Sequence, residues 1–151
     1  MRKVRLLVVL VTLAVVATAC GSDEGVQVDG IWARTSPASA DAGAVYLQMT
    51  ASEADRLIGV SVDPSVAATG QIHETVMAEG EIEGMGAMMM QEVGIVDLPA
   101  GETVDLEPGG FHIMLMRLGA PLEVGQTFDI TLTFETAGEM TFEVEVRDDA
   151  P

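Results

Sequence analysis

The residues with the most distinctive chemistry in this chain are methionines and histidines that gather in one part of the sequence. Seven of the nine methionines beyond the initiator lie between Met77 and Met116. The two histidines, His73 and His112, lie beside or within this cluster. Thioether and imidazole groups are ligands typical of a soft transition metal, copper(I) above all, whereas zinc favours thiolates and calcium favours oxygens. The cluster therefore predicts a copper(I) site.

The N-terminus indicates where such a site would be used. Three basic residues among the first five precede the apolar run 6–16, which is typical of a secretory signal and short for a membrane span. Small residues lead up to Cys20, the only cysteine, and resemble a bacterial lipobox. We expect residues 1–19 to be a lipoprotein signal peptide, Cys20 to be the lipidated first residue, and 20–27 to be a flexible tether. An ordinary signal peptide that ends near a cysteine is the alternative.

This interpretation makes the mature protein strongly acidic and extracytoplasmic, a lipoprotein on the outer face of a bacterial membrane or in the periplasm. The first nineteen residues carry three of the seven basic residues and none of the 24 acidic ones, which leaves a formal charge of −20. A nucleic acid would be repelled and is excluded as a partner. The charge otherwise fits a solubilising shell or a surface that steers a basic partner.

The mature chain has the pattern of an all-β domain. Nine short runs of strand-forming residues alternate with Gly and Pro turns, and no helical stripe extends beyond about one turn. The runs are 26–32, 44–49, 56–62, 69–77, 88–93, 103–106, 111–118, 127–135 and 140–146. We expect a single cupredoxin-like or immunoglobulin-like β-sandwich of Greek-key type with about eight or nine strands, spanning residues 28–147 before a short tail at 148–151.

Strand periodicity separates core residues from candidate ligands. In the run 111–118, His112, Met114 and Met116 share one face, and the apolar odd-numbered residues share the other. The odd face belongs to the core, so we expect the even face to point toward a rim or a shallow pocket. Outside the motif, methionine in an apolar strand is usually core filler. That interpretation is preferred for four residues: Met49, Met77, Met116 and Met140.

These residues resemble the PCu(A)C family of periplasmic copper chaperones. In that family a histidine is followed by a methionine, then by twenty-one residues and His-x-Met. Here twenty-one residues separate Met90 from His112, and Met114 completes the motif. The resemblance implies His73, Met90, His112 and Met114 as copper(I) ligands. It also implies delivery of the ion to the CuA site of cytochrome c oxidase, directly or through a Sco-type protein. We expect the protein to be a monomer.

The spacing departs from the family pattern at one point. Sixteen residues separate His73 from Met90, where about ten are more common, so we expect an enlarged loop at 79–86. Met85 and Met88 therefore compete with Met90 as the first methionine ligand, or assist it as auxiliary ligands. Met85 and Met89 fit either a surface loop or auxiliary capture of the metal.

Other functions fit the sequence less well. A blue-copper electron carrier needs a cysteine ligand, and Cys20 lies at the expected N-terminus. An enzyme is not expected, because no Ser-His-Asp or Cys-His arrangement is available once both histidines bind metal. The remaining alternative is an acidic surface lipoprotein that acts as a metal-free binding module. It predicts no gain in thermal stability with copper.

Overall fold

The computed structural model describes residues 25–77 and 88–150, which form ten β-strands. The strands are β1 (Val26–Arg34), β2 (Ala42–Ala51), β3 (Asp55–Val62), β4 (Ala67–Met77), β5 (Met88–Glu92), β6 (Val96–Leu98), β7 (Thr103–Leu106), β8 (Phe111–Leu118), β9 (Thr127–Phe134) and β10 (Gly138–Arg147). The expected signal peptide and Cys20 lie outside the described residues, as do Met85 and the whole of the expected loop 79–86.

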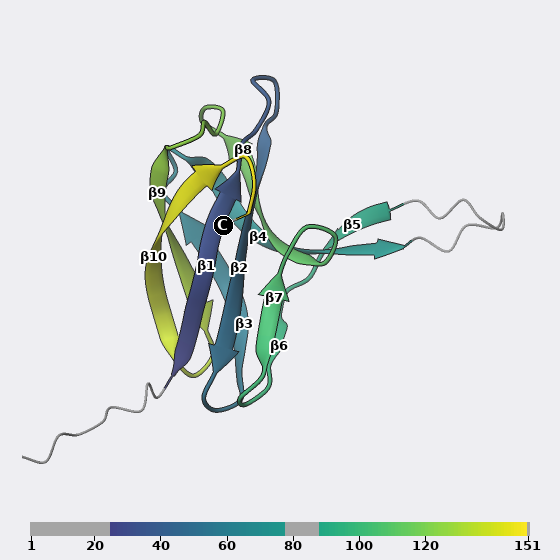
Figure 1. The fold of residues 1–151 in the computed structure, drawn as a ribbon, viewed down its shortest axis with the longest axis vertical. Coiled ribbons are helices and arrows are strands. Elements are labelled where there is room, and N and C mark those ends of the chain that lie inside the picture. The colour runs from purple at the N-terminus through teal and green to yellow at the C-terminus, as the bar shows by residue number, and fades with distance from the viewer. Residues whose placement is uncertain (1–24, 78–87, 151) are drawn as a thin grey trace, which may run out of the picture.

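The ten strands are hydrogen-bonded in the order β5-β4-β8-β7-β2-β1-β10-β9-β3-β6, with a further pairing of β8 to β2. Most neighbours are antiparallel, and β1 runs parallel to β10. The sheet curls on itself, so that strands from both halves of this order contribute to one hydrophobic core (Figure 1). β4 and β8 lie side by side because they are directly paired in this order.

Alternation along the strands builds the core, as the sequence predicts. In β9, Phe128, Ile130, Leu132 and Phe134 are buried while Thr127 and Asp129 are exposed. Ile113 and Leu115 of β8 are fully buried, and they anchor that strand against the core. The side chains on the opposite face of β8 are therefore not needed for this part of the core and can be ligands.

The expected all-β fold is confirmed, with ten strands rather than eight or nine. Each of the nine expected runs forms a strand, and the additional element is β6, three residues long and followed at once by Pro99. Within residues 25–77 and 88–150, no helix is long and apolar enough to cross a membrane.

One hairpin projects from the curled sheet. Strands β4 and β5 extend away from the rest of the molecule, and β5 lies at one edge of the sheet (Figure 1). Every residue of β5 is exposed. The first part of β4 pairs with β8, from Ala67 to Glu74, while its end pairs with β5 alone. The candidate ligands lie where the hairpin leaves the body.

Candidate metal centre

The two histidines come from neighbouring antiparallel strands and lie directly opposite each other. His73 of β4 pairs with His112 of β8. Because side chains of directly opposed residues share a face, both rings stand on the same side of the sheet. Their ring centroids are 5.8 Å apart and the planes are tilted by 47°. Strand register alone thus brings together two residues that have 38 residues between them in the sequence.

The backbone of the preceding turn sets the orientation and tautomer of His112. Its Nδ1–H donates to the carbonyl oxygen of Gly110 at 3.1 Å, since a carbonyl can only accept. The same carbonyl accepts the backbone N–H of Thr75 at 3.1 Å, which ties the turn to β4. Gly109, at φ 92°, permits this turn because glycine adopts a positive φ without strain. In the neutral ring, Nε2 of His112 therefore carries the lone pair.

A chain of side-chain hydrogen bonds sets the tautomer of His73 in the same way. The amide nitrogen of Gln71 donates to Oε2 of Glu92 at 3.1 Å, which directs the amide oxygen toward His73. The Nε2–H of His73 donates to that oxygen at 3.2 Å. The lone pair of neutral His73 is then on Nδ1. Support of the second ring nitrogen by a hydrogen bond is typical of histidines that bind metals.

The nitrogens that carry the lone pairs have no partners in the protein. His73 Nδ1, His112 Nε2 and the hydroxyl of Thr75 are the buried side-chain polar atoms without a hydrogen bond among the described residues. A buried polar atom left unpaired costs about 1–3 kcal/mol, so native proteins contain few. The two histidine nitrogens lie on the paired stretch of β4 and β8, and Thr75 follows this stretch on β4, where it pairs with β5. An acceptor of lone pairs at this place would explain the two nitrogens.

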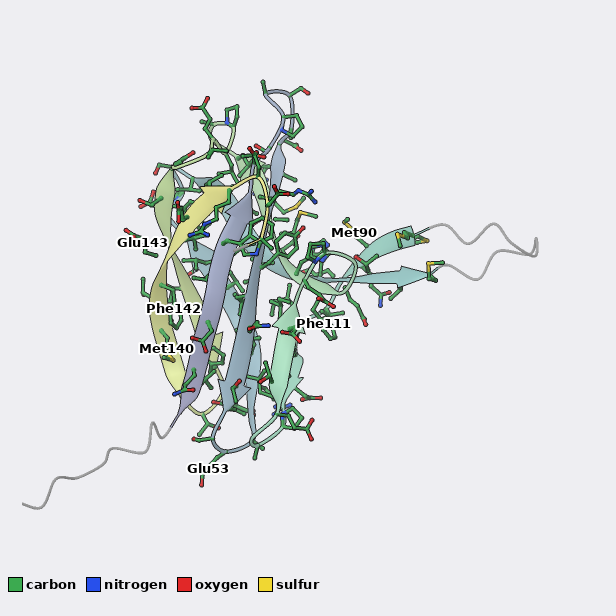
Figure 2. All side chains as sticks on the ribbon, viewed as in Figure 1. Glu53, Met90, Phe111, Met140, Phe142 and Glu143 are labelled. Carbon is green, nitrogen blue, oxygen red and sulfur yellow. The ribbon has the colours of Figure 1, made fainter. Side chains whose placement is uncertain are left out.

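The register adds sulfur to the same face. Met114 follows His112 by two residues on β8, which places the two side chains on one face about 7 Å apart along the strand. Met90 of β5 pairs with Thr75, two residues beyond His73 on β4. The four candidate ligands therefore share one face. Met90 lies where the hairpin leaves the body (Figure 2).

The competing methionines are separated by the same register. Met88 pairs with Met77, four residues beyond His73, and lies about 7 Å farther out along the strand than Met90. Met89 pairs with Val76 and lies on the opposite face. Met90 is thus the described methionine of β5 that comes nearest to the histidine pair along the register.

The electrostatic surroundings of His73 favour its neutral form, which can bind a metal. Burial lowers the pKa of His73 below 6.5, and the neighbouring His112 lowers it further, while Glu92 acts in the opposite direction. Neutral imidazole is the form that binds a metal. At neutral pH this histidine can therefore bind a cation without first releasing a proton.

Two expectations are corrected by the structure. His112 is 2% exposed, so the histidine end of the site lies deeper than the expected rim or shallow pocket. Met77 is 65% exposed, so the assignment to core filler is wrong for it, while Met49 is fully buried as expected. The error arises because β4 continues past the body of the sheet. Gln71, Glu92 and Gly110 were not predicted, although the spacing of Gln71 and His73 indicates a shared strand face.

The candidate ligands do not form a carboxylate-rich site. Among the described residues, no group of three or more His, Cys, Asp or Glu side chains could hold a metal ion. Within the described part of the chain, further protein ligands for a metal at the histidine pair would therefore be of another type. The methionine sulfurs on the same face fit a soft ion such as copper(I) and fit hard cations poorly.

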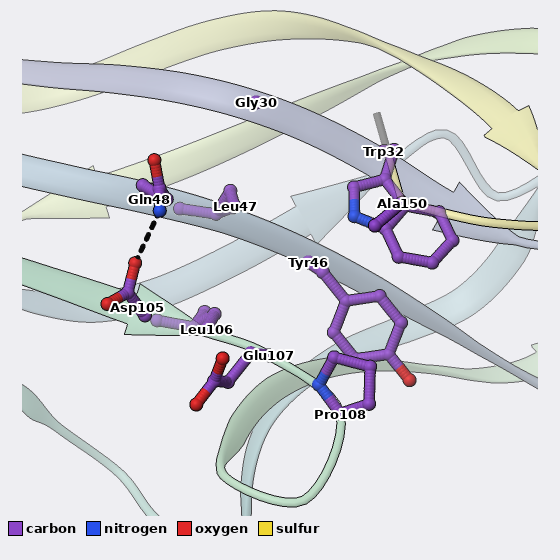
Figure 3. Close-up of a pocket in the computed structure, with 10 residues that line it drawn as sticks. All are labelled: Gly30, Trp32, Tyr46, Leu47, Gln48, Asp105, Leu106, Glu107, Pro108 and Ala150. Atoms are coloured by element: carbon purple, nitrogen blue, oxygen red, sulfur yellow. Dashed lines mark hydrogen bonds between the residues drawn. The ribbon is translucent and has the colours of Figure 1, made fainter.

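A separate hollow of about 320 Å³ lies on the side of Trp32 and Tyr46 (Figure 3). The two aromatic rings are 5.0 Å apart, and Gln48 donates to Asp105 at 2.7 Å across its floor. None of the four candidate ligands lines this hollow. It is distinct from the histidine pair, although Pro108 at its margin belongs to the turn that precedes His112.

Comparison with known proteins places the chain in a family. Residues 26–146 match the family described as "Putative lipoprotein LpqE-like". The chain belongs to this family. A curated member of similar sequence is "Putative lipoprotein Lxx21020" from Leifsonia xyli subsp. xyli, which is 37% identical over 126 residues, or 83% of this chain and 71% of that protein.

Solved structures confirm the resemblance to PCu(A)C domains. The apo PCuAC domain from PmoF1 is 26% identical with a TM-score of 0.63, over 84% of this chain and 95% of that one. The copper-bound PCuAC domain from PmoF2 is 26% identical with a TM-score of 0.61, over 84% and 94%. The copper(I) form of DR1885 from Deinococcus radiodurans is 25% identical with a TM-score of 0.64, over 88% and 86%.

Proposed function

We propose that this LpqE-like protein is a membrane-anchored, extracytoplasmic copper(I) chaperone. The observation that carries the proposal is the cross-strand histidine pair, whose two unpartnered nitrogens are buried on a face that also presents methionine sulfur. The copper-bound and copper(I)-bound states of two structural relatives support it. The lipoprotein descriptions of the family and of its curated member support anchoring through Cys20.

In this proposal the ligands are His73 Nδ1, His112 Nε2 and the sulfurs of Met90 and Met114. All four donor groups are uncharged when they bind a metal, so the complex carries only the single charge of copper(I). A d¹⁰ ion accepts the tetrahedral arrangement that ligands from β4, β5 and β8 can supply. Thioethers also avoid the disulfide formation that would disable paired thiols outside the cytosol.

The division between a buried and an exposed part of the site suits delivery. The imidazoles are held by Gly110 and Gln71, whereas Met90 is 60% exposed on the edge strand. An acceptor can therefore displace the outer sulfur first and take the ion by successive ligand exchange. The proposed acceptor is the CuA site of cytochrome c oxidase or a Sco-type protein.

Anaerobic competition with a chromogenic copper(I) chelator tests the ligand set. Met114→Leu should weaken binding by more than about 100-fold, because even partners outside the ligand shell contribute 10–100-fold to metal affinity. Met116→Leu is the matched control, since Met116 lies two residues farther along the same face of β8. Equal affinity of Met114→Leu and the parent would refute the assignment.

Anaerobic mixing of the copper(I)-loaded protein with an apo CuA domain or an apo Sco-type protein tests delivery. We expect transfer to one of them that is faster than release of copper(I) to buffer. Transfer no faster than release would contradict a chaperone role even if the ligand set were correct.

A further inference from the structure

Four large apolar side chains stand exposed on the projecting hairpin. Met77, Met88, Met89 and Met90 are 65%, 72%, 54% and 60% exposed. Sulfur atoms, in yellow, lie along this hairpin in Figure 2. Exposed apolar side chains gathered in one place indicate a binding role more often than chance. The presence of methionine at all four positions favours a binding role that uses sulfur, because leucine or valine would supply the same apolar surface.

The register divides these methionines between the two faces of the hairpin. Met77 and Met88 are directly opposed across β4 and β5, so they share a face. Met90 follows Met88 by two residues and lies on that face as well, whereas Met89 lies on the other. We call Met77, Met88 and Met90 the sulfur triad.

The triad has the dimensions of a soft-metal site. Side chains that are directly opposed have Cβ atoms about 5 Å apart, and alternate residues of a strand are about 7 Å apart. Methionine has three flexible torsions, so the three sulfurs can converge on one ion. His73 is four residues from Met77 and about 13 Å away along the strand, so among residues 25–77 and 88–150 the outer end of the triad offers sulfur as its ligand.

We propose that the sulfur triad is a second, thioether-only site for copper(I), which receives the ion at the hairpin before it reaches the histidine pair. Met90 is shared between the two sites, because it lies between Met88 and His73 on the same face. Transfer inward is a ligand exchange in which outer sulfurs leave and imidazole nitrogens bind. The ion remains copper(I) throughout. The inward step rests on the proposed function, whereas the outer site does not.

Titration of the mature chain with copper(I) under anaerobic reducing conditions tests the second site, with silver(I) as a redox-inert probe. The parent should bind two equivalents, the second more weakly, because the two sites share Met90 and only one ion at a time can have it as a full ligand. The double variant Met77→Leu/Met88→Leu should bind one. Met89→Leu is the matched control and should bind two, because it removes a sulfur of equal type and similar exposure from the opposite face. All three positions are exposed, so leucine leaves the core untouched.

X-ray absorption spectroscopy separates this proposal from the proposed function. The variant His73→Ala/His112→Ala should keep one equivalent, surrounded by sulfur alone. If this variant bound both equivalents as the parent does, the histidine site would be wrong while the triad could stand on the Met77→Leu/Met88→Leu result. The triad is refuted if the parent binds a single equivalent, if Met77→Leu/Met88→Leu still binds two, or if Met89→Leu loses as much as that double variant.

Discussion

Replacing His112 by leucine should separate the stability of the fold from its affinity for copper. His112 is buried, and its Nε2 has no hydrogen-bond partner. Relief of an unpaired buried polar atom is worth about 1–3 kcal/mol, and loss of the bond to Gly110 costs about 1 kcal/mol. The Gly110 carbonyl remains paired with the Thr75 N–H. The metal-free variant should therefore be as stable as the parent or up to about 2 kcal/mol more stable.

The copper-loaded state should behave in the opposite way. A ligand present at 100 times its dissociation constant stabilises the native state by about 2.7 kcal/mol. For a domain of this size that gain raises the melting temperature by roughly 10 °C. The parent should show this rise with copper(I), and His112→Leu should lose most of it.

Thermal unfolding followed by circular dichroism, with and without copper(I) under anaerobic reducing conditions, measures both quantities. A cooperative transition of the metal-free variant serves as the control for folding. The reasoning fails if His112→Leu destabilises the metal-free protein by about 3 kcal/mol and keeps the copper-dependent rise, because His112 would then be a structural residue.

Three further outcomes follow from individual residues. Copper(I) affinity should be level near neutral pH and fall below about pH 6. The reason is that the pKa of His73 lies below 6.5, so protonation competes with the metal at lower pH. Chelator competition across pH measures this affinity, and a constant affinity down to about pH 4.5 would contradict the prediction. Metal-free stability should fall over the same interval, since the unfolded chain binds more protons there. Asp55→Ala should lower the free energy of unfolding by about 3 kcal/mol in urea titrations. The reason is that the Asp55 carboxylate accepts hydrogen bonds from the backbone N–H groups of Arg56, Thr136 and Ala137. A loss under about 1 kcal/mol would show that water replaces the carboxylate as acceptor. Burial raises the pKa of Asp55, but these bonds outweigh it and hold that pKa below 3.8, so this stabilisation should persist above that pH and be lost as the pH falls through the lower folded value. Cys20→Ser should move the protein from the membrane to the soluble fraction on cell fractionation, and continued membrane association would argue against lipidation.

The strands were predictable because their alternation is strong. In the structure, buried and more open positions alternate along the whole of β9 and, in β8, from Ile113 to Met116. β6 was missed because three residues before Pro99 are too few to show a period. Its pairing with β3 at Asp55 to Leu57 is a tertiary interaction that local sequence does not encode.

The candidate site was predictable in composition and less so in depth. The spacing of His112 and Met114 places both on one face, and that face is the one that holds His73. The burial of His112 could not be read from the sequence, because it depends on which strands flank β8. The exposure of Met77 and Met88 likewise depends on a hairpin that extends beyond the sheet. Local alternation specifies a shared face, and only the tertiary fold decides what covers it.

The central claim is that two imidazoles and two thioethers hold one copper(I) ion on the paired face of β4, β5 and β8. X-ray absorption spectroscopy of the mature chain loaded with one equivalent of copper(I) tests it most directly. The account predicts two nitrogen and two sulfur neighbours in the parent, and loss of the nitrogen contribution in His73→Ala/His112→Ala. A first shell of sulfur alone or of oxygen in the parent would contradict it.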